Sequence, residues 1–395
     1  MSEMKKVFQV EGVNHEELRE LIKQCYYRRR PLFIWGPPGI GKSYSVRDAA
    51  REIARELNLK YSEDPRDYRG VPDKFVLIDV RASQLDPVDW RGIPIVILRT
   101  NGVEKIIVNP HNLEISNHVF ARTSWAPPAF LPDEGHGMIF LDELNLAVLS
   151  TQHAAYQLIL DRRLGEYVLP EGWVVVAAGN RQEDVPTVFE MSKALENRFL
   201  HVELKPPDHE SWTRWAARNE IDPRIIGFIN YRSSLLFKYD PRSKEKAFPT
   251  PRSWEFASDM IKKVPTTEYK RLYIYVRSAV GEGAAREFIA FLKLREKLPN
   301  LREILEYPER AKDITDLSLL HALVTNVAEY YAAKKSIERL RKAVLIAQYI
   351  PPEFAYLLFF LTKAVDPDFW INAVLQIPEF DPIAKKWIKK GYLLD

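Results

Sequence analysis

The segment of residues 36–43, Gly-Pro-Pro-Gly-Ile-Gly-Lys-Ser, constrains the fold of this chain more than any other. It follows a short apolar run, residues 31–35, which we interpret as a buried strand, and it precedes an amphipathic helix predicted from Lys42 to about Leu57. A strand, a glycine-rich turn and a helix in this order form a phosphate-binding loop, because backbone N–H groups and the helix N-terminus both point at the anion. The predicted nucleotide-binding residues are Gly36, Pro37, Pro38, Gly39, Ile40, Gly41, Lys42 and Ser43. In this pattern Lys42 reaches the β- and γ-phosphates and Ser43 ligates Mg²⁺.

Composition narrows the class of protein. The chain has 395 residues, enough for two or three domains, and its net charge of +3 argues neither for nucleic acid nor for a membrane surface. A single cysteine, Cys25, excludes a disulfide framework and suits a reducing compartment. The longest apolar run, residues 355–361, is too short to cross a bilayer, and the N-terminus lacks a signal-peptide pattern. We therefore expect a cytoplasmic protein that does not enter a membrane.

Two adjacent carboxylates end a second apolar run. Residues 137–141 form a predicted strand, and Asp142 and Glu143 follow it directly. Ligands of α/β sheets bind at the carboxyl ends of the strands, so both side chains are expected beside the phosphate loop. Asp142 can then hold Mg²⁺ together with Ser43, while Glu143 can orient and deprotonate the attacking water.

Three further polar residues are candidates for the same chemistry. Asn180 closes the predicted buried strand 173–179 with a neutral amide suited to positioning a water or a γ-phosphate, although an asparagine there is also a common turn former. Arg198 ends a helix, where it is either a cation that complements the helix dipole or a finger directed at a neighbouring subunit's nucleotide. Arg252 falls in the first turn of a helix with Thr250 as N-cap, and a cation placed against the dipole indicates a bound anion.

The remaining pattern predicts an α/β core followed by helices. We expect helices over residues 14–29, from a cap at Ser150 to about Arg163 with Gly165 ending it, and over residues 208–237, and a β-rich insertion over about residues 93–131. The expected fold class is a P-loop NTPase with a parallel sheet. Its expected domains are the nucleotide-binding core at 1–205, a helical lid at 206–280 and a helical C-terminal region at 281–395.

The ordered motifs GPPGIGKS, MIFLDELN, AAGN, ALENRF and TPRSW resemble those of the AAA+ ATPases, and more closely those of the MoxR and dynein-related branch. By that resemblance, which covers about residues 14–262, the residues have the following roles: residues 36–43 are Walker A, Asp142 and Glu143 are Walker B, Asn180 is sensor 1, Arg198 is the arginine finger and Arg252 is sensor 2.

The resemblance also implies the architecture and the partners. Residues 93–131 would be the helix-2 insert and residues 164–172 the pre-sensor-1 hairpin of that branch. Its members bind ATP and Mg²⁺ and form rings, usually homo-hexamers, and many MoxR-type ATPases work with a separate von Willebrand factor A protein. The tail after about residue 281 carries no motif of the family.

The residues leave three functions open. The first is a chaperone-like ring ATPase that hydrolyses ATP between subunits to remodel or assemble a protein client, for which Arg198 and the two insertions argue. The second is a nucleic-acid motor or restriction-type NTPase, although no basic and aromatic residues are interleaved as a strand-binding groove requires. The third is a nucleotide-gated scaffold in which hydrolysis is incidental.

Overall fold

The computed structural model describes residues 12–100, 103–107, 120–185, 189 and 191–383. It divides into two compact units, Met1–Pro206 and Pro207–Asp395, which are described separately. Within the described ranges, no helix has both the length and the apolar character needed to cross a bilayer.

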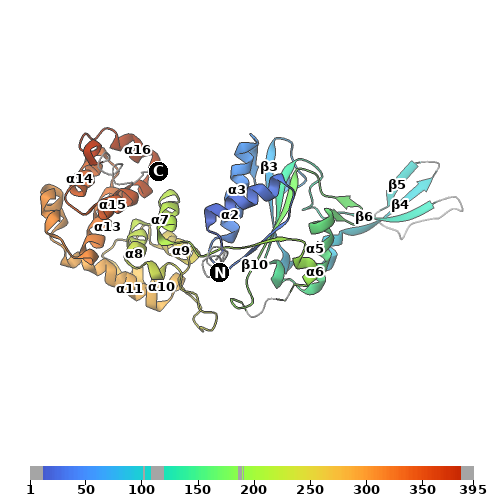
Figure 1. Ribbon diagram of the computed structural model, residues 1–395, viewed down its shortest axis with the longest axis horizontal. Helices are drawn as coiled ribbons and strands as arrows, with labels where there is room; N and C mark the ends of the chain where they lie inside the picture. The colour runs from blue at the N-terminus through green and yellow to red at the C-terminus, as the bar shows by residue number, and fades with distance from the viewer. Residues whose placement is uncertain (1–11, 101–102, 108–119, 186–188, 190, 384–395) are drawn as a thin grey trace, which may run out of the picture. The chain divides into compact units, whose positions relative to one another are not determined.

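A parallel sheet of six strands forms the centre of the first unit (Figure 1). In spatial order the strands are β11 (Leu200–Glu203), β1 (Leu32–Trp35), β10 (Trp173–Gly179), β7 (His136–Asp142), β3 (Lys74–Arg81) and β2 (Lys60–Ser62). The central strands are almost continuously apolar because helices cover both faces of a parallel sheet, and β10 is buried along its whole length. This arrangement confirms the expected parallel α/β core.

Helices α2 (His15–Tyr27) and α3 (Lys42–Glu56) lie on one face of this sheet, and α5 (Leu149–Asp161) and α6 (Lys193–Glu196) on the other (Figure 1). A capping box starts α2, since Asn14 accepts the Glu17 N–H while the Glu17 side chain accepts the Asn14 N–H. On the opposite face, Leu158 and Ile159 of α5 belong to one buried cluster with side chains of β3, β7 and β10. These helices hold the strand ends, and with them the candidate site, in place.

The insertion forms a small sheet of its own. After the short helix α4 (Pro87–Arg91), strands β4 (Ile93–Thr100), β5 (Val103–Ile107) and β6 (Phe120–Ala126) pair antiparallel in the order β5-β4-β6, and Figure 1 shows them extending away from the parallel sheet. Residues 101–102 and 108–119 of the expected insertion lie outside the described residues.

The helix cap expected at Ser150 is wrong, because Val148 is the N-cap. Helix α5 begins at Leu149, because the carbonyl of Val148 accepts the N–H groups of Thr151 and Gln152. The helix ends at Asp161, before the predicted Arg163. Gly165 instead makes the turn between strands β8 (Arg163–Leu164) and β9 (Tyr167–Val168), a two-stranded hairpin.

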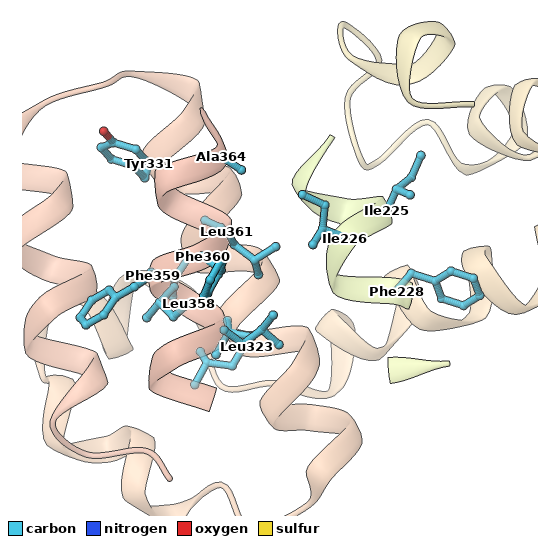
Figure 2. Packing of buried hydrophobic residues seen from close by; sticks show 14 of the residues in the cluster. Ile225, Ile226, Phe228, Leu323, Tyr331, Leu358, Phe359, Phe360, Leu361 and Ala364 are labelled. Atoms are coloured by element: carbon cyan, nitrogen blue, oxygen red, sulfur yellow. The ribbon is translucent and has the colours of Figure 1, made fainter. Parts of the chain in front are cut away.

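The second unit is helical. Its helices are α7 (His209–Arg218), α8 (Pro223–Tyr231), α9 (Pro251–Ile261), α10 (Tyr269–Val280), α11 (Glu282–Lys293), α12 (Leu301–Glu306), α13 (Leu317–Ala333), α14 (Ile337–Ala347), α15 (Pro352–Val365) and α16 (Pro367–Val374). One buried cluster runs through them from Trp212 to Ile383, so a single core spans both expected segments, 206–280 and 281–395. Figure 2 shows part of this core, with side chains of α8, α13 and α15.

The expected continuous helix over residues 208–237 is wrong. The chain breaks between α7 and α8, where Glu220 adopts a left-handed conformation (φ 54°) and Asp222 caps the new helix. Pro223 causes the break, because proline has no N–H to donate and is accommodated only in the first turn of a helix.

Candidate nucleotide site

The loop between β1 and α3 has the backbone that the glycines predict. Gly41, the N-cap of α3, has φ of 100°, and Gly36 has φ of 155°. A Cβ on Gly36 would lie 2.9 Å from the carbonyl oxygen of Leu204. No side chain caps α3, so the first N–H groups of the helix remain available to an anion.

Lys42 lies at the centre of the site. Its side chain is largely buried, with 9% of the residue exposed, and its ammonium donates to the carbonyl oxygens of Gly36 (2.6 Å) and Pro37 (2.9 Å) and to Oδ1 of Asn180 (2.9 Å). These acceptors hold the cation at the mouth of the loop. The predicted phosphate ligand and the predicted sensor are therefore in direct contact.

Ser43 and Asp142 form the second contact between the loop and the sheet. The Ser43 hydroxyl donates to Oδ2 of Asp142 at 2.9 Å. A hydroxyl beside a carboxylate fits Mg²⁺, which prefers a few hard oxygen ligands and keeps several waters. When bound, Mg²⁺ would be held by these two side chains and would neutralise phosphate charge.

Glu143 lies next to Asp142 in a strained conformation. Its φ of 57° places a non-glycine residue in the left-handed region, and its N–H donates to Oδ1 of Asp142 at 3.0 Å. Its carboxylate accepts a 2.9 Å hydrogen bond from the hydroxyl of Ser83, which follows β3. The hydrogen bond from Ser83 and the backbone conformation of Glu143 together fix the direction of the Glu143 carboxylate, the candidate base.

The order of the strands brings these residues together. Since β10 lies between β1 and β7, its last residue is followed by Asn180 between the phosphate loop and Asp142. Asn145, which is buried, donates from Nδ2 to the carbonyl oxygen of Asn180 at 2.6 Å and fixes that turn.

Sequence reasoning missed His15, Ser83 and Asn145. The Nε2 atom of His15 donates to the carbonyl oxygen of Ile40 at 2.8 Å, so the start of α2 supports the phosphate loop from behind. Asn145 belongs to the quoted MIFLDELN segment, which could have marked it. Nothing in the local pattern around His15 or Ser83 signals their contacts, because both are made across the fold.

An ion pair joins α3 to β3 one helical turn after Ser43. Arg47 of α3 bonds Oδ2 of Asp79 on β3 at 2.6 Å and also Glu63 at 3.0 Å. Burial raises the pKa of Asp79, an effect that the charge of Arg47 opposes. This pair ties α3 to the strand that neighbours β7.

Arg198 lies at the opposite ends of the strands: it precedes the amino end of β11, whereas the phosphate loop follows the carboxyl end of β1. Leu200 is the register partner of Leu32 at the start of β1, whereas the phosphate loop follows the end of β1. From Leu32 to Gly36 is four residues, so at about 3.3 Å per residue the two levels are separated by about 13 Å, which an arginine side chain cannot span. The Arg198 guanidinium stacks on the ring of Tyr156, 3.5 Å from its centroid, and donates to the carbonyl oxygen of Ala194 at 2.6 Å.

Arg252 belongs to the second unit. It is an exposed residue in the first turn of α9, and the structure confirms Thr250 as N-cap and Pro251 in the first helical position. Its role as sensor 2 stays a prediction.

Comparisons with known proteins place few constraints on the chain. No family model matches it, and no curated protein is similar to it. Among solved structures it is similar to a RuvB mutant of Thermotoga maritima (14% identity, TM-score 0.31, covering 79% of this chain and 80% of that one). It is also similar to NtrX of Brucella abortus in complex with ADP (12% identity, TM-score 0.29, covering 95% of this chain and 68% of that one). A third similar structure is an ATPase of Cytophaga hutchinsonii whose description marks its function as unproven (14% identity, TM-score 0.31, covering 88% of this chain and 79% of that one). At these TM-scores the argument for the fold rests on the sheet and the phosphate loop of the chain itself.

Proposed function

We propose that this chain is an AAA+ ATPase of the MoxR type, which forms a ring and couples hydrolysis of Mg²⁺·ATP between subunits to the remodelling or assembly of a protein client. The observation that carries the proposal is the pair of hydrogen bonds from the phosphate loop to the sheet, Lys42 to Asn180 and Ser43 to Asp142. They join a polyphosphate cradle, a metal-binding pair and a polar sensor in one place.

The residues of the site divide the work of hydrolysis. Backbone N–H groups of the loop and Lys42 bind and orient the triphosphate. Glu143 takes a proton from the attacking water, and Asn180 positions that water or the γ-phosphate. Positioning and charge stabilisation supply most of the catalysis in phosphoryl transfer, so small displacements of these groups should cost much activity.

The position of Arg198 supports a site shared between copies. Because the strand level that Arg198 precedes lies about 13 Å from its own phosphate loop, a phosphate that it contacts belongs to another copy of the chain. An arginine finger supplied in trans is typically worth about 10³ to 10⁵ in rate, so an isolated copy should be nearly inactive.

Two features outside the site support a mechanical role. The insertion sheet β5-β4-β6 and the hairpin β8-β9 add nothing to the phosphate contacts described above. Both arise from the unit that holds the nucleotide, so hydrolysis can move them against a client. A von Willebrand factor A protein as adaptor is part of this proposal and rests on the resemblance of the motifs.

Mixed assemblies test the shared site. Arg198→Ala and Glu143→Gln chains should each be inactive alone, whereas a co-assembled one-to-one mixture should recover up to about a quarter of wild-type activity. That value follows because a complete site needs an Arg198→Ala chain beside a Glu143→Gln neighbour, each with a chance of one half. Lys193→Ala, which removes an exposed cation of the preceding helix α6, is the matched control and should leave hydrolysis unchanged. Absence of recovery in mixtures shown to be co-assembled contradicts the trans role.

Nucleic acid provides the second arm of the test. A nucleic-acid motor would show ATP hydrolysis stimulated by single- or double-stranded DNA, with a steep dependence on salt. We expect no stimulation at low salt, and a clear stimulation would favour the motor over the protein remodeller.

A further inference from the structure

A pocket of about 400 Å³ opens at the edge of the sheet opposite the phosphate loop. It lies between the end of α2, the second half of α5 and the residues that precede β11. Buried apolar side chains such as Leu158 and Phe199 line part of it. The charged residues that line it are four arginines: Arg29, Arg30, Arg162 and Arg198.

The positive charges of these four arginines are not compensated equally by neighbouring groups. Arg29 forms an ion pair with Glu171 at 3.1 Å, and Arg162 donates to the carbonyl oxygens of Trp173 and Pro170 at 2.8 and 2.7 Å. No carboxylate is among the described residues that line the pocket. Burial, and then the charge of Arg29, lowers the pKa of Arg162, as expected where cations gather without an anion.

Arg30 is an exposed residue, and its guanidinium has no ion pair or hydrogen bond with any described residue. It is followed by Pro31, which fixes the exit from the helix. The sheet places it beside Arg198. Leu32 pairs with Leu200 in parallel register, and the Leu200 N–H donates to the carbonyl oxygen of Pro31 at 2.9 Å. Arg30 and Arg198 therefore each precede one of two paired strands by two residues.

Two guanidinium groups on neighbouring chain segments repel each other unless an anion lies between them. Their planar forks match phosphate oxygens in two-point contacts, and a pocket of this volume is larger than a single carboxylate needs. A phosphate of a polyphosphate chain fits both the charge and the space.

We propose that this pocket binds a phosphate group, with Arg30 as a direct phosphate ligand beside Arg198. Resting on the proposed function, the phosphate is that of the nucleotide held by a neighbouring copy, which makes Arg30 a second trans residue of the shared site. The same chemistry could be satisfied by free phosphate or polyphosphate from solution, and the experiment below separates the two sources.

The first arm compares Arg30→Gln with Arg28→Gln. Both remove an exposed cation from the end of α2, but Arg28 does not line the pocket, so it is the matched control. Removing one preorganised donor to a phosphoryl group typically costs about 10²-fold in turnover, so Arg30→Gln should lower kcat about 100-fold while Arg28→Gln stays within twofold of wild type. Arg30→Lys should recover part of the loss, because it restores the charge without the fork. Equal activity of the Arg30 and Arg28 variants overturns the proposal.

The second arm locates the phosphate. If it belongs to a neighbour's nucleotide, a co-assembled mixture of Arg30→Gln and Glu143→Gln chains should recover activity, as the Arg198→Ala mixture does. Recovery with Arg198→Ala but not with Arg30→Gln would overturn the trans role of Arg30 and leave the proposed function standing. Failure of both mixtures would remove the shared site itself.

The third arm uses a chain whose own phosphate loop is disabled. Lys42→Ala protein, diluted until it is monomeric, is titrated with inorganic tripolyphosphate and followed by calorimetry. We expect no binding that depends on Arg30. Saturable binding that the further change Arg30→Gln abolishes would identify free polyphosphate as the ligand and overturn the neighbour as its source.

Discussion

Gly179→Ala should disable the site without touching a residue that contacts nucleotide. Gly179 is the last residue of β10, directly before Asn180. A Cβ at this position would lie 2.3 Å from Oδ1 of Asn145 and 2.8 Å from Cζ of Phe33. Both neighbours are buried and packed, so neither can simply turn away.

The cost follows from the geometry. Asn145 must retreat by about 0.7 Å to bring its oxygen to 3.0 Å, the closest distance that real Cβ atoms allow. That shift stretches its 2.6 Å hydrogen bond to the carbonyl oxygen of Asn180. Overpacking costs about 1–3 kcal/mol and an unsatisfied buried hydrogen-bonding group about 1–3 kcal/mol, for a total of about 2–6 kcal/mol. The displaced Asn180 should lower kcat at least about tenfold.

Hydrogen exchange of peptides that cover β10, together with ATP turnover by the assembled protein, measures both effects. A loss of 2 kcal/mol corresponds to about 30-fold faster exchange. Gly283→Ala is the matched control: its Cβ would meet nothing within 4 Å, and alanine is favoured over glycine inside α11, so turnover should be unchanged. Wild-type exchange and turnover in Gly179→Ala would refute the role assigned to Asn145 in holding Asn180.

Three further predictions concern the buried charge of the second unit, its pH dependence and the metal. Asp222→Ala should destabilise the second unit by about 3–5 kcal/mol, because Arg224 is buried (4% exposed) and bonded to both Asp222 oxygens, whereas the exposed Asp259→Ala should cost little; equal unfolding midpoints in urea would contradict this. Burial lowers the pKa of His321 to about 4, so the folded second unit binds fewer protons than the unfolded chain between pH 6.5 and 4 and loses up to about 3 kcal/mol as the pH falls through that range. His321→Leu should remove this part of the acid dependence, measured as exchange of α13 peptides against pH, and an unchanged profile would contradict the assignment. Ser43→Ala should raise the Mg²⁺ concentration needed for half-maximal hydrolysis about tenfold or more, and an unchanged Mg²⁺ titration would refute Ser43 as a ligand.

Much of the fold could be predicted because it is locally encoded. The apolar run 31–35, the glycine turn and the amphipathic helix after Lys42 predict β1, the phosphate loop and α3, and the structure has all three within about one residue. Local periodicity failed to predict the helix boundaries where a different capping group or a proline determined them. Helix α5 starts from the Val148 carbonyl instead of the Ser150 side chain, and Pro223 divides the helix expected over 208–237.

The amino-acid pattern established which groups are available: a phosphate loop with Lys42 and Ser43, two carboxylates after an apolar strand, and Asn180 at a strand end. It could not determine which strands are neighbours, because parallel pairing joins segments far apart in the chain and leaves no local periodicity. Only the tertiary structure put β10 between β1 and β7, and with it Asn180 against Lys42. The parallel pairing of β1 with β11 likewise put Arg30 beside Arg198, at the amino ends of the strands. Parallel strands bring the residues that precede them to one end of the sheet and the residues that follow them to the other.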